Sequence, residues 1–202
     1  MTTTLTQRLN QILPRITSEA FLSSEGIGNE IAFYIFDYPA EEELTVREHI
    51  KMLTSRLETY HSDLSFLHLN LLDVTLAYLQ QRRLFDKALK MEANKGTAAV
   101  LHALEGPMAA EKISKFITKT YKPAEYDLVL VSGVGSVWPI LRAHSLLSSL
   151  HKDMGKTPMV MFYPGTFDGR TLRLFGRIAS TTSNPAKKPY YRAFELIPGE
   201  KA

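Results

Sequence analysis

The chain has 202 residues, of which 45% are hydrophobic and 22% charged, and its formal net charge is +3. This composition excludes a disordered chain and supplies enough apolar residues for a buried core. The absence of cysteine excludes disulfides, thiolate zinc sites and cysteine nucleophiles. No stretch approaches the roughly 18 apolar residues of a membrane span, and the first residues contain no uninterrupted apolar segment, so we expect a cytoplasmic protein.

The charges are divided unevenly along the chain. Residues 1–126 hold 14 Lys and Arg against 16 Asp and Glu, whereas residues 127–202 hold 10 against 5, so the two parts carry −2 and +5. A basic C-terminal third permits DNA binding or an acidic partner, although a charge of this size is more often a solvated surface.

The N-terminal part predicts a helix followed by a buried strand. Apolar residues recur at helical spacing over residues 4–22, with Pro14 as the expected break, and we expect residues 1–25 to pack on the domain as an N-terminal helix. The short apolar and aromatic run Ile31–Pro39 is bounded by turn residues, which indicates a buried strand ending near Asp37.

The middle of the chain is predominantly helical in pattern. Residues 41–60 place apolar side chains at spacings of three and four behind three glutamates, which suit a helix N-terminus. A second strand starts at Leu64 and leads into one helix over residues 73–93, with a stop at Gly96. A further helix is predicted over residues 107–121.

The C-terminal part predicts extended segments joined by a helix and loops. The helix follows Trp138, and a polar loop over residues 179–189 is expected to be flexible. The predicted strands cover residues 127–132, 157–163, 171–178 and 190–198.

The alternation of apolar strands and helices predicts one α/β domain over residues 1–202, with a mostly parallel β-sheet flanked by helices. Ligand sites in such sheets lie beyond the carboxyl ends of the strands, so the loops after several strands should share one edge. The residues expected at this edge are Asp37, Ser132, Gly133, Gly135, Ser136, Tyr163, Gly165 and Asp168.

The stretch LVLVSGVGSVWPILRAHSLLSSL resembles the opening of a phosphate-binding domain, in which a strand runs into glycines and a helix. Counted from Gly133, the second glycine and the lysine of a phosphate loop would fall on Trp138 and Pro139. The third glycine of a dinucleotide fingerprint would also fall on Trp138. The sequence therefore indicates a fold that resembles a nucleotide-binding domain without a functional phosphate loop.

The same turn leaves one binding alternative open. Gly133 and Gly135 would form a tight turn, Ser136 would cap the following helix, and Pro139 would lie in its first turn. Backbone N–H groups at a helix start can bind an anion without a lysine. A nucleotide or anion sensor at Ser132, Gly133, Gly135 and Ser136 is therefore an alternative to a purely structural turn.

The sequence contains no recognisable catalytic set. The six histidines lack partners at metal-ligand spacing, and SGVGS does not have the order of a nucleophile elbow. We therefore expect a protein that is not an enzyme and that binds no metal or cofactor. Asp168 lies near Arg170, Arg173 and Arg177, which are simplest to interpret as loop and edge-strand charges. A DNA-associated module in this basic C-terminal region is a second alternative.

Four stretches taken together resemble one protein family. In their order and residue pattern they are similar to the B component of BREX bacteriophage-exclusion systems. The stretches are GIGNEIAFYIFDYPAEEELTVREHI, LVLVSGVGSVWPILRAHSLLSSL, TPMVMFYPGTFDGRTLRLFGRI and YYRAFELIP. The likeness covers nearly the whole chain. The segment STTSNPAKKP is longer than the usual link of that family.

The resemblance implies a cytoplasmic component of a bacterial anti-phage locus, working beside an ATPase, a DNA methyltransferase and a large phosphatase-superfamily protein of the PglZ type. It supplies no catalytic residues. Together with a sheet that lacks catalytic machinery, it predicts a non-catalytic adaptor that docks onto a larger BREX component, for which the PglZ-type protein is the leading candidate. The expected interaction residues are Asp37, Arg142, Asp168, Arg170, Arg173 and Arg177.

Overall fold

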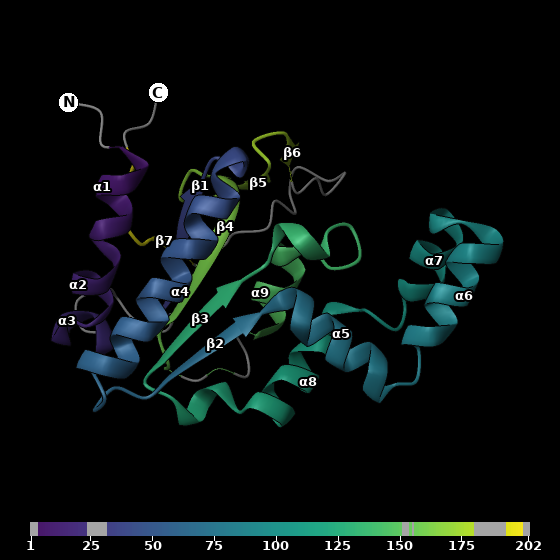
Figure 1. Ribbon diagram of the computed structural model, residues 1–202, viewed down its shortest axis with the longest axis horizontal. Coiled ribbons are helices and arrows are strands. Elements are labelled where there is room, and N and C mark those ends of the chain that lie inside the picture. Colours follow the sequence, from purple (N-terminus) through teal and green to yellow (C-terminus); the bar gives the residue numbers. More distant parts are fainter. Residues whose placement is uncertain (1–3, 24–31, 151–153, 155, 180–192, 200–202) are drawn as a thin grey trace.

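The computed structural model describes residues 4–23, 32–150, 154, 156–179 and 193–199. Its centre is a β-sheet whose main path has the strand order β2-β3-β4-β1-β7, and every neighbouring pair along this path is parallel (Figure 1). Helices cover both faces of the sheet. The prediction of a single α/β domain with a mostly parallel sheet is confirmed.

The strands of the main path include the apolar runs that the sequence predicts. Strands β5 and β6 follow β4 in the chain, and β5 pairs antiparallel with both β4 and β6. The bounds are β1 Phe33–Tyr38, β2 Phe66–Asn70, β3 Leu128–Ser132, β4 Met159–Phe167, β5 Leu172–Leu174, β6 Ile178–Ala179 and β7 Phe194–Glu195.

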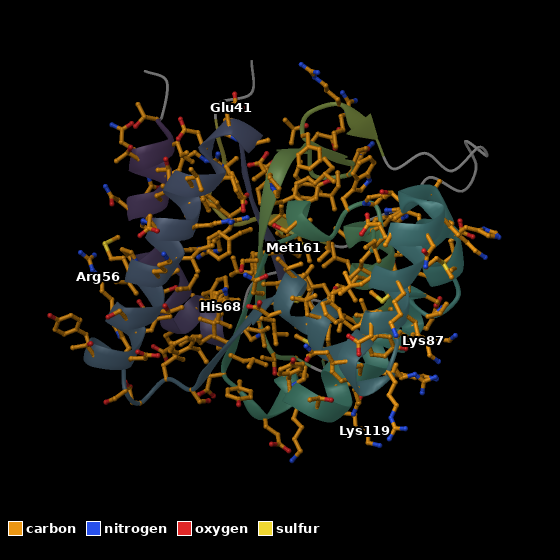
Figure 2. All side chains as sticks on the ribbon, turned by 45° about the vertical axis from the view of Figure 1, so that its right-hand side comes forward. Glu41, Arg56, His68, Lys87, Lys119 and Met161 are labelled. Carbon is orange, nitrogen blue, oxygen red and sulfur yellow. The ribbon has the colours of Figure 1, made fainter. Side chains whose placement is uncertain are left out.

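Alternation along each strand divides the core into two layers. Side chains of successive residues point to opposite faces, so Phe33 and Ile35 of β1 join one apolar cluster while Tyr34 and Phe36 join the other. In β4, Met161 lies in the first cluster, near the middle of the side chains in Figure 2. Both faces of the central strands are therefore buried, as expected for a parallel sheet.

Four helices cover the face that contains Tyr34 and Phe36: α1 Leu5–Asn10, α2 Ile12–Ile16, α3 Glu19–Leu22 and α4 Glu43–Tyr60. The expected interruption of the first helix at Pro14 is wrong by three residues, since α1 ends and α2 begins around Gln11. Pro14 lies in the first turn of α2, where a residue needs no intrahelical N–H donor. Residues 1–3, 24 and 25 of the predicted helix lie outside the described residues.

The opposite face is covered mainly by α5 Leu71–Gln81, α8 Ala110–Tyr121 and α9 Ala143–Leu150. The prediction of one helix over 73–93 is wrong, because α5 and α6 Phe85–Lys95 are separate helices. Arg83 between them has φ 55°, a left-handed conformation that ends the helical run without Gly or Pro. The predicted stop at Gly96 is confirmed.

The remaining helical segments extend the predictions. Helix α7, Thr97–Leu104, was not predicted; it packs beside α6, and the pair projects from the body of the molecule (Figure 1). Helix α8 begins at Ala110 rather than at residue 107. Single 3₁₀ turns cover Ala40–Glu42, Pro123–Glu125 and Gly135–Val137.

The C-terminal strands differ from the prediction, because residues 171–178 form not one strand but two short antiparallel strands, β5 and β6, joined by a turn. Strand β4 continues four residues beyond Tyr163, through Gly165 to Phe167. A side chain at residue 165 would collide with the backbone oxygen of Arg173, so glycine there allows β5 to fold back closely on β4. Of the predicted flexible loop over 179–189, residues 180–189 lie outside the described residues, as do residues 190–192 of the last predicted strand.

Candidate functional site

The carboxyl ends of the parallel strands form one edge of the sheet, as the sequence predicts. Asp37 of β1 is aligned with Tyr163 of β4, and Ser132 of β3 is aligned with Asn70 of β2. Two groups of polar side chains lie at this edge. One surrounds Asp37, and the other surrounds Ser132.

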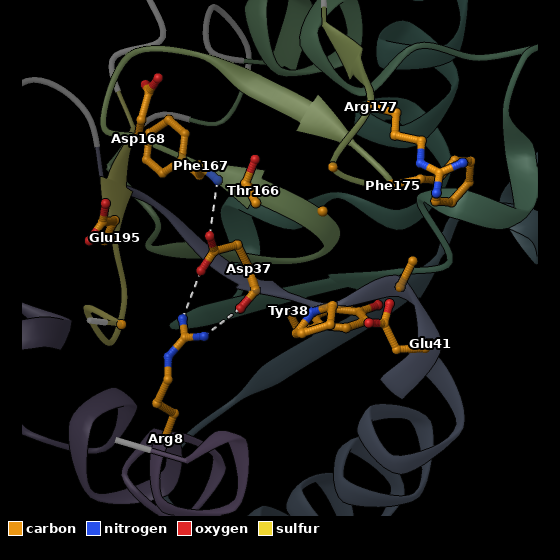
Figure 3. A pocket seen from close by; sticks show the side chains of 15 residues that line it. Arg8, Asp37, Tyr38, Glu41, Thr166, Phe167, Asp168, Phe175, Arg177 and Glu195 are labelled. Atoms are coloured by element: carbon orange, nitrogen blue, oxygen red, sulfur yellow. Dashed lines mark hydrogen bonds and ion pairs between the residues drawn. The ribbon is translucent and has the colours of Figure 1, made fainter. Parts of the chain in front are cut away.

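Asp37 is held by an arginine that the sequence reading did not single out. One Nη of Arg8 donates to a carboxylate oxygen of Asp37 at 2.7 Å, and the other donates to the Asp37 backbone oxygen at 2.8 Å (Figure 3). The second carboxylate oxygen accepts from the Phe167 N–H at 2.9 Å. The Arg8 guanidinium also donates to the Ile197 carbonyl and lies 4.7 Å from the centre of the Phe36 ring. Asp37 is therefore a structural joint between α1, β1, β4 and the C-terminal segment.

A cavity of about 790 Å³ opens beside this joint. Asp37, Asp168 and Arg177, three of the predicted interaction residues, line it together with Arg8 and Glu41 (Figure 3). Its wall combines both signs of charge with aromatic rings. The cavity therefore does not have the uniformly basic lining of a phosphate site.

The carboxylate of Asp168 organises the loop after β4. One of its oxygens accepts from the backbone N–H groups of Arg170 and Thr171, at 2.9 and 2.6 Å. This is the turn-forming role of an Asp side chain, which accepts hydrogen bonds from the residues two and three positions later. Asp168 thus shapes the β4–β5 connection.

The glycine turn does not start a helix where the sequence predicts one. Gly135–Val137 form a 3₁₀ turn, the Trp138–Pro139 peptide bond is cis, and α9 begins only at Ala143. Trp138 is extended, with φ −72° and ψ 139°, because the following proline disfavours helical geometry in the residue before it. The predicted roles of Ser136 as the helix cap and of Pro139 in the first helical turn are therefore wrong.

Gly133 is needed in the turn for two reasons. Its φ is +73°, and a Cβ there would collide with the side-chain oxygen of Asn70. That oxygen accepts from the Leu72 N–H at 2.9 Å and so caps α5. The glycine turn therefore packs closely against the start of another helix.

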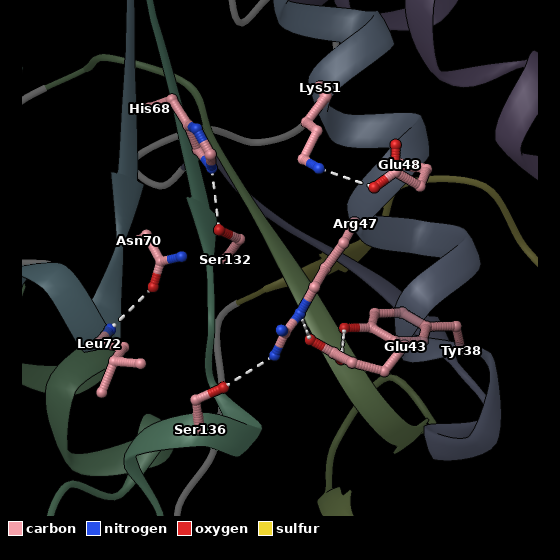
Figure 4. Close-up of polar contacts among 10 residues, drawn as sticks. All are labelled: Tyr38, Glu43, Arg47, Glu48, Lys51, His68, Asn70, Leu72, Ser132 and Ser136. Carbon is pink, nitrogen blue, oxygen red and sulfur yellow. Dashed lines mark hydrogen bonds and ion pairs between the residues drawn. The ribbon is translucent and has the colours of Figure 1, made fainter.

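The second polar group lies between the turn and α4. Arg47 of α4 donates to the Ser136 hydroxyl at 3.1 Å and to Glu43 at 2.8 Å (Figure 4). His68 shares a hydrogen bond with the Ser132 hydroxyl at 2.9 Å, and burial lowers the pKa of this histidine. The turn thus has a cation beside it that no local motif could have indicated, because Arg47 lies 89 residues earlier in the chain.

Two aromatic side chains are exposed at the same end of the molecule. Trp138 and Phe175 are 40% and 37% exposed, and their rings meet edge to face with centroids 6.3 Å apart. Phe175 has φ +55° and Gly176 has φ +68°, so they form the two central residues of a tight hairpin turn. A bulky residue is rare in this conformation, and keeping one there costs about 1–3 kcal/mol.

The remaining interaction candidates are exposed arginines. Arg142 precedes α9, Arg170 and Arg173 belong to the β4–β5 hairpin, and Arg177 lines the cavity. None of the four forms an ion pair with another described residue. Among all residues that the structure describes, no three His, Asp or Glu side chains are grouped to hold a metal ion.

Comparison with known proteins identifies the family. A family model described as BREX protein BrxB matches residues 67–196. The chain belongs to the BrxB family. It is 42% identical to the BREX protein BrxB of Escherichia coli O9:H4 (strain HS) over 194 residues, which cover 96% of this chain and 92% of that protein. It is 40% identical to the BREX protein BrxB of Bacillus cereus (strain H3081.97) over 197 residues, covering 96% and 97%.

Membership of the BrxB family makes the protein a component of a BREX phage-defence system. The matched region contains the glycine turn, Trp138 and the Phe175 hairpin, whereas Arg8 and Asp37 lie before it. No solved structure matches this chain. Among the described helices, none is both long and apolar enough to cross a membrane.

Proposed function

We propose that this protein is a non-catalytic adaptor that docks onto a larger BREX component, the PglZ-type phosphatase-superfamily protein. Through that partner it would associate indirectly with the methyltransferase and ATPase components. The surface assigned to docking lies at the carboxyl end of the sheet. This docking face consists of Trp138, Phe175, Arg142, Arg170, Arg173 and Arg177.

The observation that carries the proposal is the exposed pair Trp138 and Phe175. Aromatic and arginine side chains dominate the binding energy of protein interfaces, usually as a few central residues. Here both types come from loops and from β5 at one end of the sheet, and the two rings already contact each other in the free protein. Phe175 also keeps an unfavourable backbone conformation although Asn or Gly would suit the turn better. A role for its exposed ring explains that choice.

The polar residues of this edge support a non-catalytic role. Asp37 is engaged by Arg8 and a backbone N–H, and Glu43 is engaged by Arg47 and the Tyr38 hydroxyl. These carboxylates therefore hold structural elements together. A general base needs a side chain within reach of substrate and a pKa suited to proton transfer, and the carboxylates described here are occupied by structural partners.

The test is co-migration of the purified chain with the PglZ-type protein on size exclusion at micromolar concentration. We expect one complex, and Trp138→Ala should weaken it at least 30-fold, about the 2 kcal/mol of an interface hot spot. Tyr60→Ala is the matched control, because Tyr60 is 76% exposed at the far end of α4. Separate migration of the wild-type proteins would contradict the adaptor role. If Trp138→Ala and Tyr60→Ala bind the partner equally well, the assignment of the docking face is wrong.

A second candidate is the nucleotide or anion sensor at the turn of Ser132, Gly133, Gly135 and Ser136. The observation in its favour is Arg47, which brings a guanidinium to Ser136. Since α9 begins at Ala143, the site would depend on this guanidinium more than on a helix N-terminus.

Calorimetry with ATP, GTP, a dinucleotide and inorganic phosphate tests the sensor. Binding should be lost in Arg47→Gln and kept in Lys51→Gln, which removes a charge one turn further along α4 where Lys51 pairs with Glu48. The absence of heat at millimolar ligand would exclude the sensor.

A further inference from the structure

The middle of the chain carries a strong positive charge. It is not apparent when the charges of residues 1–126 are summed together, because the acidic residues 1–81 offset it. Residues 82–122 hold 9 Lys and Arg against 4 Asp and Glu, whereas residues 1–81 hold 5 against 11. The two segments therefore carry +5 and −6. Helices α1–α4, which belong to the first segment, and α8, which belongs to the second, cover opposite faces of the sheet.

The folded chain presents these cations outward from neighbouring helices. On α8, Lys112, Lys115 and Lys119 are spaced by three and four residues and exposed, opposite the buried Ile113 and Ile117. Helix α5 packs against both α6 and α8. Figure 2 shows Lys87 of α6 and Lys119 of α8 pointing outward on the same side of the molecule. We call this the basic face, formed by Arg82, Arg83, Lys87, Lys90, Lys112, Lys115 and Lys119.

The cations of the basic face are not neutralised by neighbours. None of its seven members forms an ion pair with any residue of the described ranges. On α4, by contrast, Arg47 pairs with Glu43 and Lys51 pairs with Glu48. A group of uncompensated like charges creates a positive potential over this surface, which attracts a polyanionic ligand.

We infer that the basic face binds the phosphate backbone of double-stranded nucleic acid. Five of its seven members are lysines, a residue type depleted in protein–protein interfaces but well suited to phosphate contacts. On α6 and α8, Leu89 is the one large apolar side chain that is exposed among the described residues. The face therefore lacks the exposed aromatic rings on which single-stranded bases stack. It also differs from the basic C-terminal region, which the sequence offered as an alternative DNA-binding module.

The experiment is fluorescence anisotropy of the full chain with a labelled 25-base-pair DNA duplex and the matching RNA duplex. Both should bind at about 50 mM salt and weaken steeply by about 200 mM, as phosphate contacts require. The triple variant K112Q/K115Q/K119Q should lose at least 10-fold in affinity, and its salt slope should flatten by up to about 2.7. The pair K87Q/K90Q should act in the same direction.

The matched control is R15Q/K51Q/R56Q, which removes three exposed charges from α2 and α4 on the other side of the sheet. Each variant is first shown to unfold at the wild-type temperature. No duplex binding at about 50 mM salt, or equal losses in the two triple variants, would overturn the inference. The inference would also be overturned if polyglutamate bound as tightly as the duplex. It would likewise be overturned if only R170Q/R173Q/R177Q lost affinity for the duplex. Trp138→Ala should bind duplex normally, so failure here and failure of the adaptor role are distinguishable.

Discussion

Arg8 and Asp37 form an ion pair at 2.7 Å that joins the first helix of the protein to the end of its first strand. Their side chains are only 10% and 21% exposed, and the guanidinium also donates to the carbonyl of Ile197. Breaking a buried pair from one side leaves an uncompensated charge, which costs about 3–5 kcal/mol. The contact is therefore part of the stability of the fold.

The first prediction concerns this joint. Arg8→Ala should lower the free energy of unfolding by about 3 kcal/mol, because the Asp37 carboxylate and the Ile197 carbonyl both lose donors. Arg8→Lys keeps the charge but not the fork of donors, so its loss should be intermediate. Urea unfolding at pH 7 measures both. A change below about 0.5 kcal/mol in Arg8→Ala would show that the pair contributes nothing.

The second prediction tests the left-handed backbone at Phe175. Phe175→Ala and Phe175→Gly both remove the ring, but only glycine adopts a φ of +55° without strain. The glycine variant should therefore be more stable than the alanine variant by about 1–2 kcal/mol. Thermal unfolding of the two proteins measures the difference. If alanine is the more stable of the two, the hairpin does not hold this conformation in solution.

The third prediction concerns the close contact at Gly165. Gly165→Ala would push a methyl group into the Arg173 backbone, which cannot move without separating β5 from β4, so a loss of more than about 2 kcal/mol is expected. Gly106→Ala is the control, because a Cβ there would meet no atom within 4 Å. Calorimetric unfolding should leave the control within about 0.5 kcal/mol of wild type. Similar melting of the two variants would argue against the hairpin packing.

The fourth prediction is a loss of stability in mild acid. Burial lowers the pKa of His68, and burial together with the nearby Arg56 lowers that of His49, below the ordinary 6.5. The unfolded chain then binds more protons than the folded one between the lowered pKa values and 6.5. Stability should be complete above about pH 6.5 and fall as the pH drops through that window.

Urea unfolding at pH 7.5 and 5.5 measures this effect. His49→Gln and His68→Gln should each reduce the difference between the two pH values. His102→Gln should not, because the side chain of His102 is 87% exposed. A pH dependence that survives both of the first two substitutions would have another source.

Much of the fold follows from local patterns. Strands β1, β3 and β4 are short apolar runs buried on both faces, and such runs are visible in sequence. The break between α5 and α6 is not visible, because Arg83 adopts a left-handed conformation without the usual glycine. The predicted helix directly after Trp138 is wrong, because Pro139 keeps Trp138 extended and α9 begins only at Ala143.

The candidate sites depended more on tertiary contacts. Asp37 was correctly placed at the edge of the sheet, but its partner Arg8 was missed. A signal was present: Arg8 lies three residues after Leu5 and four before Ile12, on the apolar side of the helix, where a charge needs a buried partner. Arg47 beside Ser136 had no such signal, because only the packing of α4 brings it there.

The joint made by Arg8 also has a consequence for synthesis on the ribosome. Its acceptor at Ile197 emerges about 160 residues after Asp37, an interval on the order of 10 s at ordinary elongation rates. Until then β7 cannot pair with β1, and the outer edge of β1 stays open to wrong partners. During synthesis the unpaired edge of β1 must therefore be kept from aggregating until β7 has left the ribosome.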